Sequence, residues 1–285
     1  MTTLELNDPT TEMYIYAIGS VFVLNLLLYL AVQTCLKRDN SWIDCMWSVI
    51  HAVPNIVVWL MRGTDEITPR MVLITVPIII WAARLSLYIL IRHKSEDYRY
   101  REMRQGWEEK GTCFYYFASL VFVYLMQGLF SLIANSSALF VNLYSSGAVD
   151  KKLVWSDYVG LAIWIAGFSI EVAADAQLAS HLKNPKPGSG KFLRTGVWRY
   201  SRHPNYFGES VMWWGIWVIA CGEEWGWVTV YSCIFITLCI RFLSGVPFPE
   251  KKYANNPEWQ EYCKETNVFV MLPARLDNST LKEPI

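Results

Sequence analysis

The residues best suited to chemistry lie between positions 181 and 209, in the segment HLKNPKPGSGKFLRTGVWRYSRHPNYFGE. This segment contains six Lys or Arg, two His and no acidic residue before Glu209. Phosphate groups bind to basic side chains, to the free N–H groups of glycine-rich backbone and to helix N-termini such as the one expected near Pro204. A basic loop resting on anionic lipid would explain the charge. It would not explain the Gly, Trp, Tyr, Asn and Glu residues among the cations, so we predict an anion-binding site.

A second group of polar residues interrupts the apolar parts of the chain. Glu171 and Asp175 are one helical turn apart, and two like charges at that spacing repel unless a cation or hydrogen-bond donor binds them. Charged groups within a membrane span mark function or pairing, because each costs about 2.5 to 3.5 kcal/mol at the centre. Residues of this kind also occur in other apolar runs: Asp44, His51, Asn55, Arg84, Asn205, Glu209 and Arg241.

Each of these residues also has a structural interpretation. Arg84 and Arg241 can reach the membrane surface or pair with acids, and an isolated His51 is more often packed and hydrogen-bonded than catalytic. Their depths nevertheless agree, because five of the apolar runs place polar side chains on one side of the membrane. We therefore predict one pocket, shared by these side chains and open to the cytosol.

The elements that must position these residues are membrane helices. Of the 285 residues, 53% are hydrophobic, and the mean hydropathy is positive, a balance that soluble domains rarely reach. A membrane span needs about 20 apolar residues of helix. Seven runs fit, the sixth of them short: 13–36, 45–61, 71–91, 112–134, 153–179, 206–222 and 225–246. Residues 135–148 are ambiguous, and the fold class is an all-α polytopic membrane protein.

The basic residues give the orientation, because cytosolic loops are enriched in Lys and Arg. With seven spans, nineteen Lys or Arg fall on one side and four on the other, and two lie within spans. The four are Arg62, Arg70, Lys151 and Lys152. We therefore place the N-terminus in the lumen and the C-terminus in the cytosol.

The chain is expected to form one transmembrane domain over residues 1–285. Spans one to five, residues 13–180, form its substrate side. Residues 181–285 supply the nucleotide-binding loop, the closing helical hairpin and the tail. The seven Cys have no CxxC spacing and lie mostly in apolar runs, so we interpret them as reduced packing residues and expect no metal site. The first twelve residues lack Lys and Arg, so no cleaved signal peptide is expected.

Residues 194–209, RTGVWRYSRHPNYFGE, resemble the signature of the steroid 5-alpha-reductase family of membrane oxidoreductases and its large uncharacterised branch. Further matches are EVAADAQ at 171–177, SGVPFPEKKY at 244–253 and WAARLSLYILIRHKSEDYRYREMR at 81–104. The resemblance covers about two thirds of the chain. It implies a seven-span fold that holds NADPH in a cavity open to the cytosol, a hydrophobic or lipid substrate entering from the bilayer, and location in the endoplasmic reticulum. Nothing in the sequence indicates a nucleic-acid partner.

The resemblance also implies roles for single residues. Asn205 and Glu209 match family residues that hold the nicotinamide, and Tyr253 matches a tyrosine near the cofactor phosphates. Glu171 and Asp175 lie where the family places an Asn and an Asp against the adenosine and ribose. Glu171 is thus a departure from the family pattern. Three residues of the basic segment are further candidates for phosphate contact: Arg199, Arg202 and His203.

The expected reaction is hydride delivery to an activated C=C bond, most simply an enone, while a donor stabilises charge on the carbonyl oxygen. Such a donor contributes about 3 to 4 kcal/mol in a dry site. The candidate catalytic residues are Asp44, kept protonated by burial, with Tyr98 and Tyr206; His51 is a further possible donor. The substrate-polarising acid of the family lies in its N-terminal half, where this chain does not align, so a steroid substrate does not follow from the resemblance.

An isoprenylcysteine-type membrane methyltransferase is the alternative. Those enzymes also carry an RHPxY turn between two late spans, but they bind S-adenosylmethionine. The basic EKKY stretch at 250–253 and the PNYFGE motif at 204–209 favour the reductase. A lipid-binding scaffold or transporter would explain the intramembrane charges but not the nucleotide-like loop, and the chain has no internal repeats.

The orientation can be tested at a glycosylation sequon. Asn278-Ser279-Thr280 is a sequon that this topology places in the cytosol, where glycosylation does not occur. We expect no endoglycosidase-sensitive shift of the protein expressed in eukaryotic cells. Sugar attached to Asn278 would refute the predicted orientation.

Overall fold

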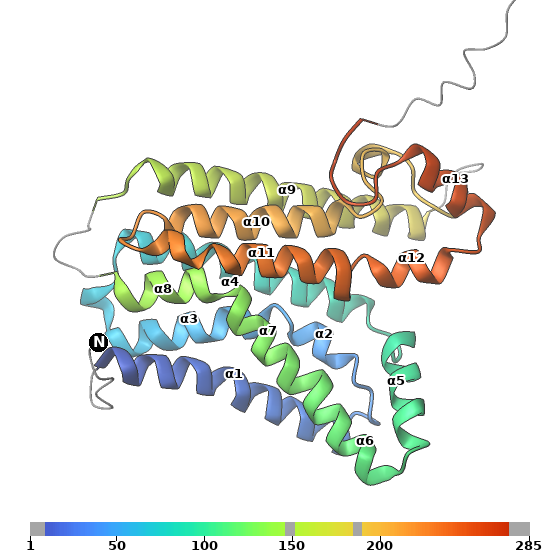
Figure 1. The fold of residues 1–285 in the computed structure, drawn as a ribbon, viewed down its shortest axis with the longest axis horizontal. Helices are drawn as coiled ribbons and strands as arrows, with labels where there is room; N and C mark the ends of the chain where they lie inside the picture. Colours follow the sequence, from blue (N-terminus) through green and yellow to red (C-terminus); the bar gives the residue numbers. More distant parts are fainter. Residues whose placement is uncertain (1–8, 146–151, 185–189, 274–285) are drawn as a thin grey trace, which may run out of the picture. The chain divides into compact units, whose positions relative to one another are not determined.

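The computed structural model describes residues 9–145, 152–184 and 190–273, and the ordered elements in this part of the chain are helices (Figure 1). Six helical stretches are long and apolar enough to cross a membrane. The all-α polytopic membrane fold predicted from the sequence is therefore confirmed. Two compact units can be distinguished, Met1–Tyr158 with Ile216–Ser232, and Val159–Gly215 with Cys233–Ile285.

Most elements of the first unit come from the N-terminal half. They are α1 (Pro9–Thr34), α2 (Trp42–Met46), α3 (Val49–Arg62), the 3₁₀ turn η1 (Thr64–Glu66), α4 (Pro69–Arg92), α5 (Tyr98–Glu108), α6 (Thr112–Ser119), the π-helical turn η2 (Leu120–Leu125), α7 (Met126–Ala134), α8 (Ser136–Tyr144) and the 3₁₀ turn η4 (Gly226–Val230). The helices α6, η2 and α7 follow one another without a break, so together they make the predicted fourth span.

The second unit contains the closing helices and the tail. Its elements are α9 (Trp155–Lys183) from Val159 on, the 3₁₀ turn η3 (Gly196–Arg199), α10 (Pro204–Ala220) up to Gly215, α11 (Tyr231–Leu238) from Cys233 on, the π-helical turn η5 (Cys239–Ser244), α12 (Pro247–Tyr253) and α13 (Pro257–Glu265). With 17 residues, α10 is the predicted short sixth span.

Residues 135–148, ambiguous in the sequence, contain α8. Its nine residues rise only about 14 Å, which is too short to cross a hydrocarbon core of about 30 Å. The Asn135 side chain that begins this segment is fully buried and donates to the His51 carbonyl at 3.0 Å. Asn135-Ser136-Ser137 is also a glycosylation sequon, and this burial closes Asn135 to modification.

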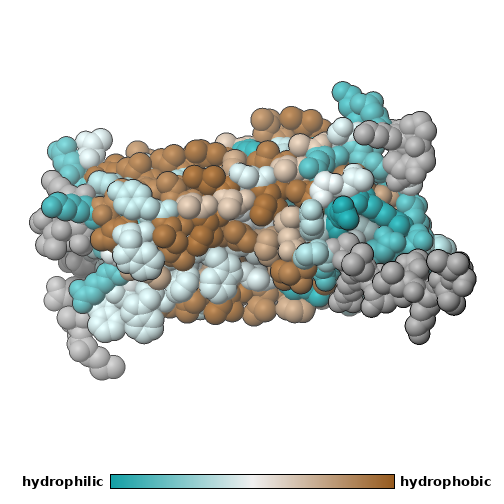
Figure 2. Space-filling view, turned by 90° about the horizontal axis from the view of Figure 1, so that it is seen from above, coloured by the Kyte–Doolittle hydropathy of each residue, from teal (hydrophilic) through white to brown (hydrophobic). Residues whose placement is uncertain are grey.

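Lipid-facing side chains explain the high hydrophobic content. Leu60, Ile91 and Trp155 are each more than two-thirds exposed, which would be costly for a protein in water. Apolar residues cover much of the visible face in Figure 2. These side chains are exposed because they face the bilayer.

Buried amides join helices inside the first unit. Asn142 Nδ2 donates to Asn55 Oδ1 at 2.7 Å and to the Thr75 hydroxyl at 2.9 Å, and its own Oδ1 accepts from Trp59 Nε1 at 2.8 Å. Hydrogen bonds of this kind link membrane helices at a net gain of about 0.6 to 2 kcal/mol each. They connect α3, α4 and α8 in a fixed register.

A buried ion triad makes a second connection in the first unit. Arg70 Nε donates to Asp157 at 2.8 Å, and Arg70 Nη1 donates to Glu223 at 2.9 Å. All three side chains are nearly inaccessible. Removing one partner of such a buried pair typically costs about 3 to 5 kcal/mol, because a charge is left uncompensated.

The turn between α1 and α2 is strained and is held by ion pairs. Lys37 and Arg38 both have left-handed backbone, with φ of 53° and 60°. Each such residue costs about 1 to 3 kcal/mol. Arg38 Nη2 donates to the Tyr116 hydroxyl at 2.8 Å and Nη1 lies 3.4 Å from Glu108, so α5 and α6 fix this turn.

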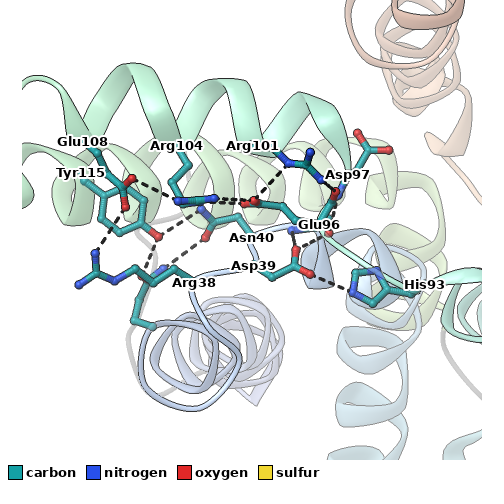
Figure 3. Close-up of polar contacts among 12 residues, drawn as sticks. Arg38, Asp39, Asn40, His93, Glu96, Asp97, Arg101, Arg104, Glu108 and Tyr115 are labelled. Atoms are coloured by element: carbon teal, nitrogen blue, oxygen red, sulfur yellow. Dashed lines mark hydrogen bonds and ion pairs between the residues drawn. The ribbon is translucent and has the colours of Figure 1, made fainter.

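Figure 3 shows the larger network around that turn, all of it within the first unit. Arg104 of α5 bonds Glu96 at 2.8 Å and Glu108 at 3.2 Å, and His93 Nε2 lies 3.1 Å from Asp39. Many cations predicted on the cytosolic side are therefore paired with acids.

Asn40, next to Asp39 in the same turn, is buried. Its Oδ1 accepts hydrogen bonds from the hydroxyls of Ser119 and Tyr124 and from the Gln33 amide.

Close glycine contacts hold α9 against α10 in the second unit. A Cβ added at Gly208 would lie 2.6 Å from the carbonyl oxygen of Gly167, and one added at Gly215 would lie 2.6 Å from that of Gly160. Only glycine allows backbones to approach this closely, as in membrane helix pairs with small interface residues. Figure 1 shows α9 and α10 running side by side.

The glycine contact can be tested away from the polar residues. Gly215→Ala should lower stability by about 1–3 kcal/mol, because the new methyl forces the two backbones apart. Thermal unfolding in detergent would measure this. Gly19→Ala is the control, since nothing lies within 4 Å of a Cβ at Gly19 and alanine favours a helix by up to about 1 kcal/mol. Equal unfolding temperatures for the two variants would contradict the close contact.

Candidate functional site

The α9–α10 contact brings together four of the predicted cofactor residues. Glu171 and Asp175 on α9 are both 2% exposed, and Glu209 on α10 is 8% exposed. Asn205 Nδ2 lies 3.5 Å from Asp175 Oδ1, a long hydrogen bond. A Cβ at Gly208 would lie 2.8 Å from the backbone nitrogen of Glu171, so the two helices meet at the level of these side chains.

One acceptor in this cluster, Asn205 Oδ1, has no partner within the described residues. It is a buried amide oxygen, and leaving such an oxygen unbonded costs about 1–3 kcal/mol. Asn205 also lies in the first turn of α10, whose N-terminal end attracts negative charge. The cluster therefore presents buried acceptors beside a helix N-terminus, and it suits a ligand that carries amide or hydroxyl donors together with anionic groups.

The turn before α10 is held by an acid from the tail. Arg202 donates to both carboxylate oxygens of Glu250, at 2.9 and 3.1 Å, and to the carbonyl oxygen of Thr266 at 2.6 Å. His203 Nε2 lies 2.9 Å from Glu250 Oε1. Since these donors of Arg202 already have partners, we assign it a structural role, and a phosphate would have to displace Glu250 to reach them.

Further contacts fasten the tail to the 190–203 loop. Arg194 bonds Glu261 at 3.2 Å and the carbonyl of Glu258 at 2.6 Å, and the Tyr262 hydroxyl donates to the Trp198 carbonyl. The sequence interpretation missed this pairing because it stressed the basic stretch at 250–253. The sequence signal that could have predicted this pairing is the recurrence of acids in the tail, at Glu250, Glu258, Glu261 and Glu265.

The remaining predicted residues of this region differ in their surroundings. Arg199 is exposed at the end of η3, so it can contact a phosphate in solution. The Tyr253 ring packs 5.0 Å from that of Phe192, and Lys191 Nζ lies 5.2 Å from the Tyr253 ring centroid. Tyr206 stacks on His203 at 5.7 Å. Residues 185–189 of the predicted loop lie outside the described residues.

Asp44, the predicted catalytic acid, is clamped within the first unit. Arg99 Nη2 donates to its Oδ2 at 2.7 Å, and the Tyr100 hydroxyl donates to its Oδ1 at 2.6 Å. Gln127 Nε2 in turn donates to the Tyr100 oxygen at 3.2 Å. Burial and the Asp44 charge raise the pKa of Tyr100 well above its ordinary value, so the phenol keeps its proton.

Sequence reasoning chose Tyr98 as the partner of Asp44, whereas the printed hydrogen bonds come from Arg99 and Tyr100. Tyr98 is half-buried in the first turn of α5, next to both. The signal available in the sequence was depth in the membrane, which does not tell Tyr98, Arg99 and Tyr100 apart before the packing of α5 is known. The prediction that Asp44 shares one pocket with the second-unit cluster stays a prediction.

The intramembrane arginines have aromatic neighbours. The Arg84 guanidinium lies 5.1 Å from the Tyr88 ring centroid and that of Arg241 lies 4.7 Å from the Phe242 ring. His51 is fully buried, and its Nδ1 lies 2.8 Å from the Trp47 carbonyl oxygen. Within the described part of the chain, no group of His, Cys, Asp and Glu could hold a metal ion.

The family described as "Protein of unknown function (DUF1295)" matches residues 29–266. The chain belongs to this family. The resemblance to the steroid 5-alpha-reductase-like proteins that its motifs suggest is confirmed by the curated relatives of this DUF1295 family member.

Two such relatives are similar over part of their length. The chain is 33% identical over 101 residues to "Steroid 5-alpha-reductase DET2" of Gossypium hirsutum, a match covering 34% of this chain and 37% of the relative. It is 30% identical over 87 residues to "3-oxo-5-alpha-steroid 4-dehydrogenase 1" of Macaca fascicularis, covering 30% of each. The matched part thus spans about a third of these relatives, and no solved structure matches this DUF1295 family member.

Stability should depend on pH through His203. Burial lowers the pKa of His203 below its ordinary 6.5, and the hydrogen bond with Glu250 offsets this only in part. As pH falls below 6.5, the unfolded chain takes up the proton first, so folding stability is lost in that range. The stability of the wild type relative to His203→Gln should therefore shrink between pH 7.5 and 5.5 in detergent unfolding experiments. A difference that does not change with pH would contradict a buried neutral His203.

Proposed function

We propose that this DUF1295 family member is an NADPH-dependent membrane reductase that acts on a C=C bond, enone-like, of a hydrophobic sterol- or lipid-like substrate. The observation that carries the proposal is the buried acceptor cluster at the α9–α10 contact, with the unbonded Asn205 Oδ1 at its edge. The relatives support it, since one named as a steroid 5-alpha-reductase and one named as a 3-oxo-5-alpha-steroid 4-dehydrogenase match part of the chain. The substrate enters from the bilayer, and the endoplasmic reticulum is the proposed location.

The residues of the second unit fit NADPH in their chemistry. Asn205 and Glu209 would accept hydrogen bonds from the carboxamide of the nicotinamide. Glu171 and Asp175 would accept from ribose hydroxyls other than the adenosine 2′ position, which carries a phosphate in NADPH and is bound by a cation rather than by an acid. Exposed Arg199, near the N-terminus of α10, would contact phosphate.

When bound, NADPH supplies a hydride to an electron-poor carbon. The protein must hold the nicotinamide in place and keep water out, and the burial of Glu171, Asp175 and Glu209 serves both tasks. The α9–α10 contact holds the two backbones that carry these acceptors close together. Preorganised polar groups of this kind account for much of the effect of dry active sites.

On the substrate side we propose that the clamp around Asp44 stabilises negative charge on the substrate oxygen. Tyr100 stays protonated and donates to Asp44, and Gln127 and Arg99 complete a chain of donors. Asp44 accepts from two donors and so needs no proton of its own in this arrangement. The group that would face the substrate oxygen is then Arg99 or the neighbouring Tyr98, with Asp44 as the residue that positions them.

Cofactor titration tests the proposal. NADPH should bind the detergent-purified wild type saturably, as followed by its fluorescence. Asn205→Ala should weaken it roughly threefold to tenfold and Glu209→Gln by tenfold or more, because neutral and charge-assisted hydrogen bonds are worth about 0.5–1.5 and 1.5–3 kcal/mol. Asn255→Ala, which changes an exposed asparagine of the same unit, is the matched control and should bind as the wild type does.

The same samples should be titrated with S-adenosylmethionine by calorimetry. Saturable binding of S-adenosylmethionine without NADPH binding would replace the reductase by the methyltransferase alternative. NADPH binding that is unaffected by both substitutions would remove Asn205 and Glu209 from the site.

A further inference from the structure

A polar cavity of about 220 Å³ in the first unit lies between α2, the last turns of α4 and the 93–97 loop. The lining residues that matter here are Ser41, Asp44, Tyr88, Arg92, Ser95 and Asp97. The cavity does not involve the proposed cofactor residues of α9 and α10. It combines cationic, anionic and hydroxyl groups at the end of a predicted membrane span.

One part of the cavity is an incompletely paired cation. Arg92 Nη1 donates to the Tyr88 hydroxyl at 2.5 Å, and within the described residues it contacts no carboxylate. The Ser95 hydroxyl, three residues further on, lines the same cavity and is exposed. A guanidinium with spare donors beside a hydroxyl is well suited to phosphate oxygens.

Another part of the cavity is anionic. Asp44 accepts one hydrogen bond on each oxygen and its side chain remains 27% exposed. Asp97 contributes a second carboxylate, whose Oδ1 accepts from Arg99 Nε at 2.8 Å. Ser41 contributes a hydroxyl that donates to Asp39. Since a carboxylate oxygen can accept more than one hydrogen bond, these groups can bind a primary ammonium. A quaternary ammonium has no N–H donors and is recognised by aromatic cages, which these lining groups do not form.

The surface next to the cavity is apolar. Leu87, Leu90 and Ile91 lie in the same turns of α4 as the lining residues and are 57%, 47% and 71% exposed. In the predicted topology this end of α4 is at the cytosolic face of the membrane. A ligand whose charged end fills the cavity would therefore have its hydrocarbon chains along α4.

We propose that this cavity binds the headgroup of a phospholipid with a phosphate diester and a primary ammonium, of the phosphatidylethanolamine class. Arg92 and Ser95 hold the phosphate, and Asp44 and Asp97 hold the ammonium. The opposite charges of the headgroup match those of the cavity walls, so binding requires no net charge to be buried. The proposal shares Asp44 with the proposed substrate side of the reductase, but its test needs neither NADPH nor a reaction.

Lipid binding to the purified full-length protein tests this, without any nucleotide. Native mass spectrometry would count dioleoyl phosphatidylethanolamine and dioleoyl phosphatidylcholine bound from mixed micelles. We expect one tightly bound phosphatidylethanolamine, preferred over phosphatidylcholine by about tenfold or more. Arg92→Ala should weaken it by a similar factor, and Ser95→Trp should weaken it by filling the cavity without changing charge.

Arg101→Ala is the matched control, because Arg101 is an arginine of α5 that is half exposed and does not line the cavity. It should bind as the wild type does. If soluble phosphoethanolamine competes with phosphatidylethanolamine but inorganic phosphate does not, the cavity recognises both charges of the headgroup. Equal binding of both lipids, competition by inorganic phosphate alone, or binding unchanged in both Arg92→Ala and Ser95→Trp would each overturn the proposal.

Discussion

The distance between α9 and α10 is the constraint on which the proposed site depends. Glycine faces backbone at two levels of this contact, and an added Cβ at Gly208 or at Gly215 would lie 2.6 Å from the facing carbonyl oxygen. Because the helices touch there, Glu171 and Asp175 of one helix reach the level of Asn205 on the other. A cluster of acids in a membrane protein is expensive. The proposed reductase function places the cofactor at this cluster.

The acids of the C-terminal tail hold the turn before α10 in place. Glu250 accepts two hydrogen bonds from Arg202 and also bonds His203, so the turn that starts α10 is fixed from the C-terminal side. Tail acids neutralise Arg194 as well, and this reduces the positive charge left for a nucleotide. Cations of the basic segment are thus paired with tail acids and hold the turn before α10 in place, so the segment is not an open cationic surface. Its exposed remainder, including Arg199, is the part that can meet phosphate.

Much of this fold could be predicted from the sequence, because membrane spans follow from hydropathy alone. The runs at 13–36 and 71–91 correspond to α1 and α4 within a few residues. The side-chain partners that join different helices could not be predicted in the same way. Depth in the membrane placed Asp44 and Tyr98 in one predicted pocket but could not select Tyr100 over Tyr98, and the bond between Arg202 and Glu250 joins residues 48 positions apart. Such contacts depend on how helices pack, which a single sequence does not record.

The most direct test of the central claim is a double-mutant cycle on NADPH affinity with Gly208→Ala and Asn205→Ala. If the close contact creates the site, Gly208→Ala alone should weaken binding by at least tenfold, and adding Asn205→Ala should then weaken it little further. Gly215→Ala, which disturbs the same helix pair away from the acids, should weaken binding less. Fully additive losses, or unchanged affinity in Gly208→Ala, would show that the nucleotide does not depend on this contact.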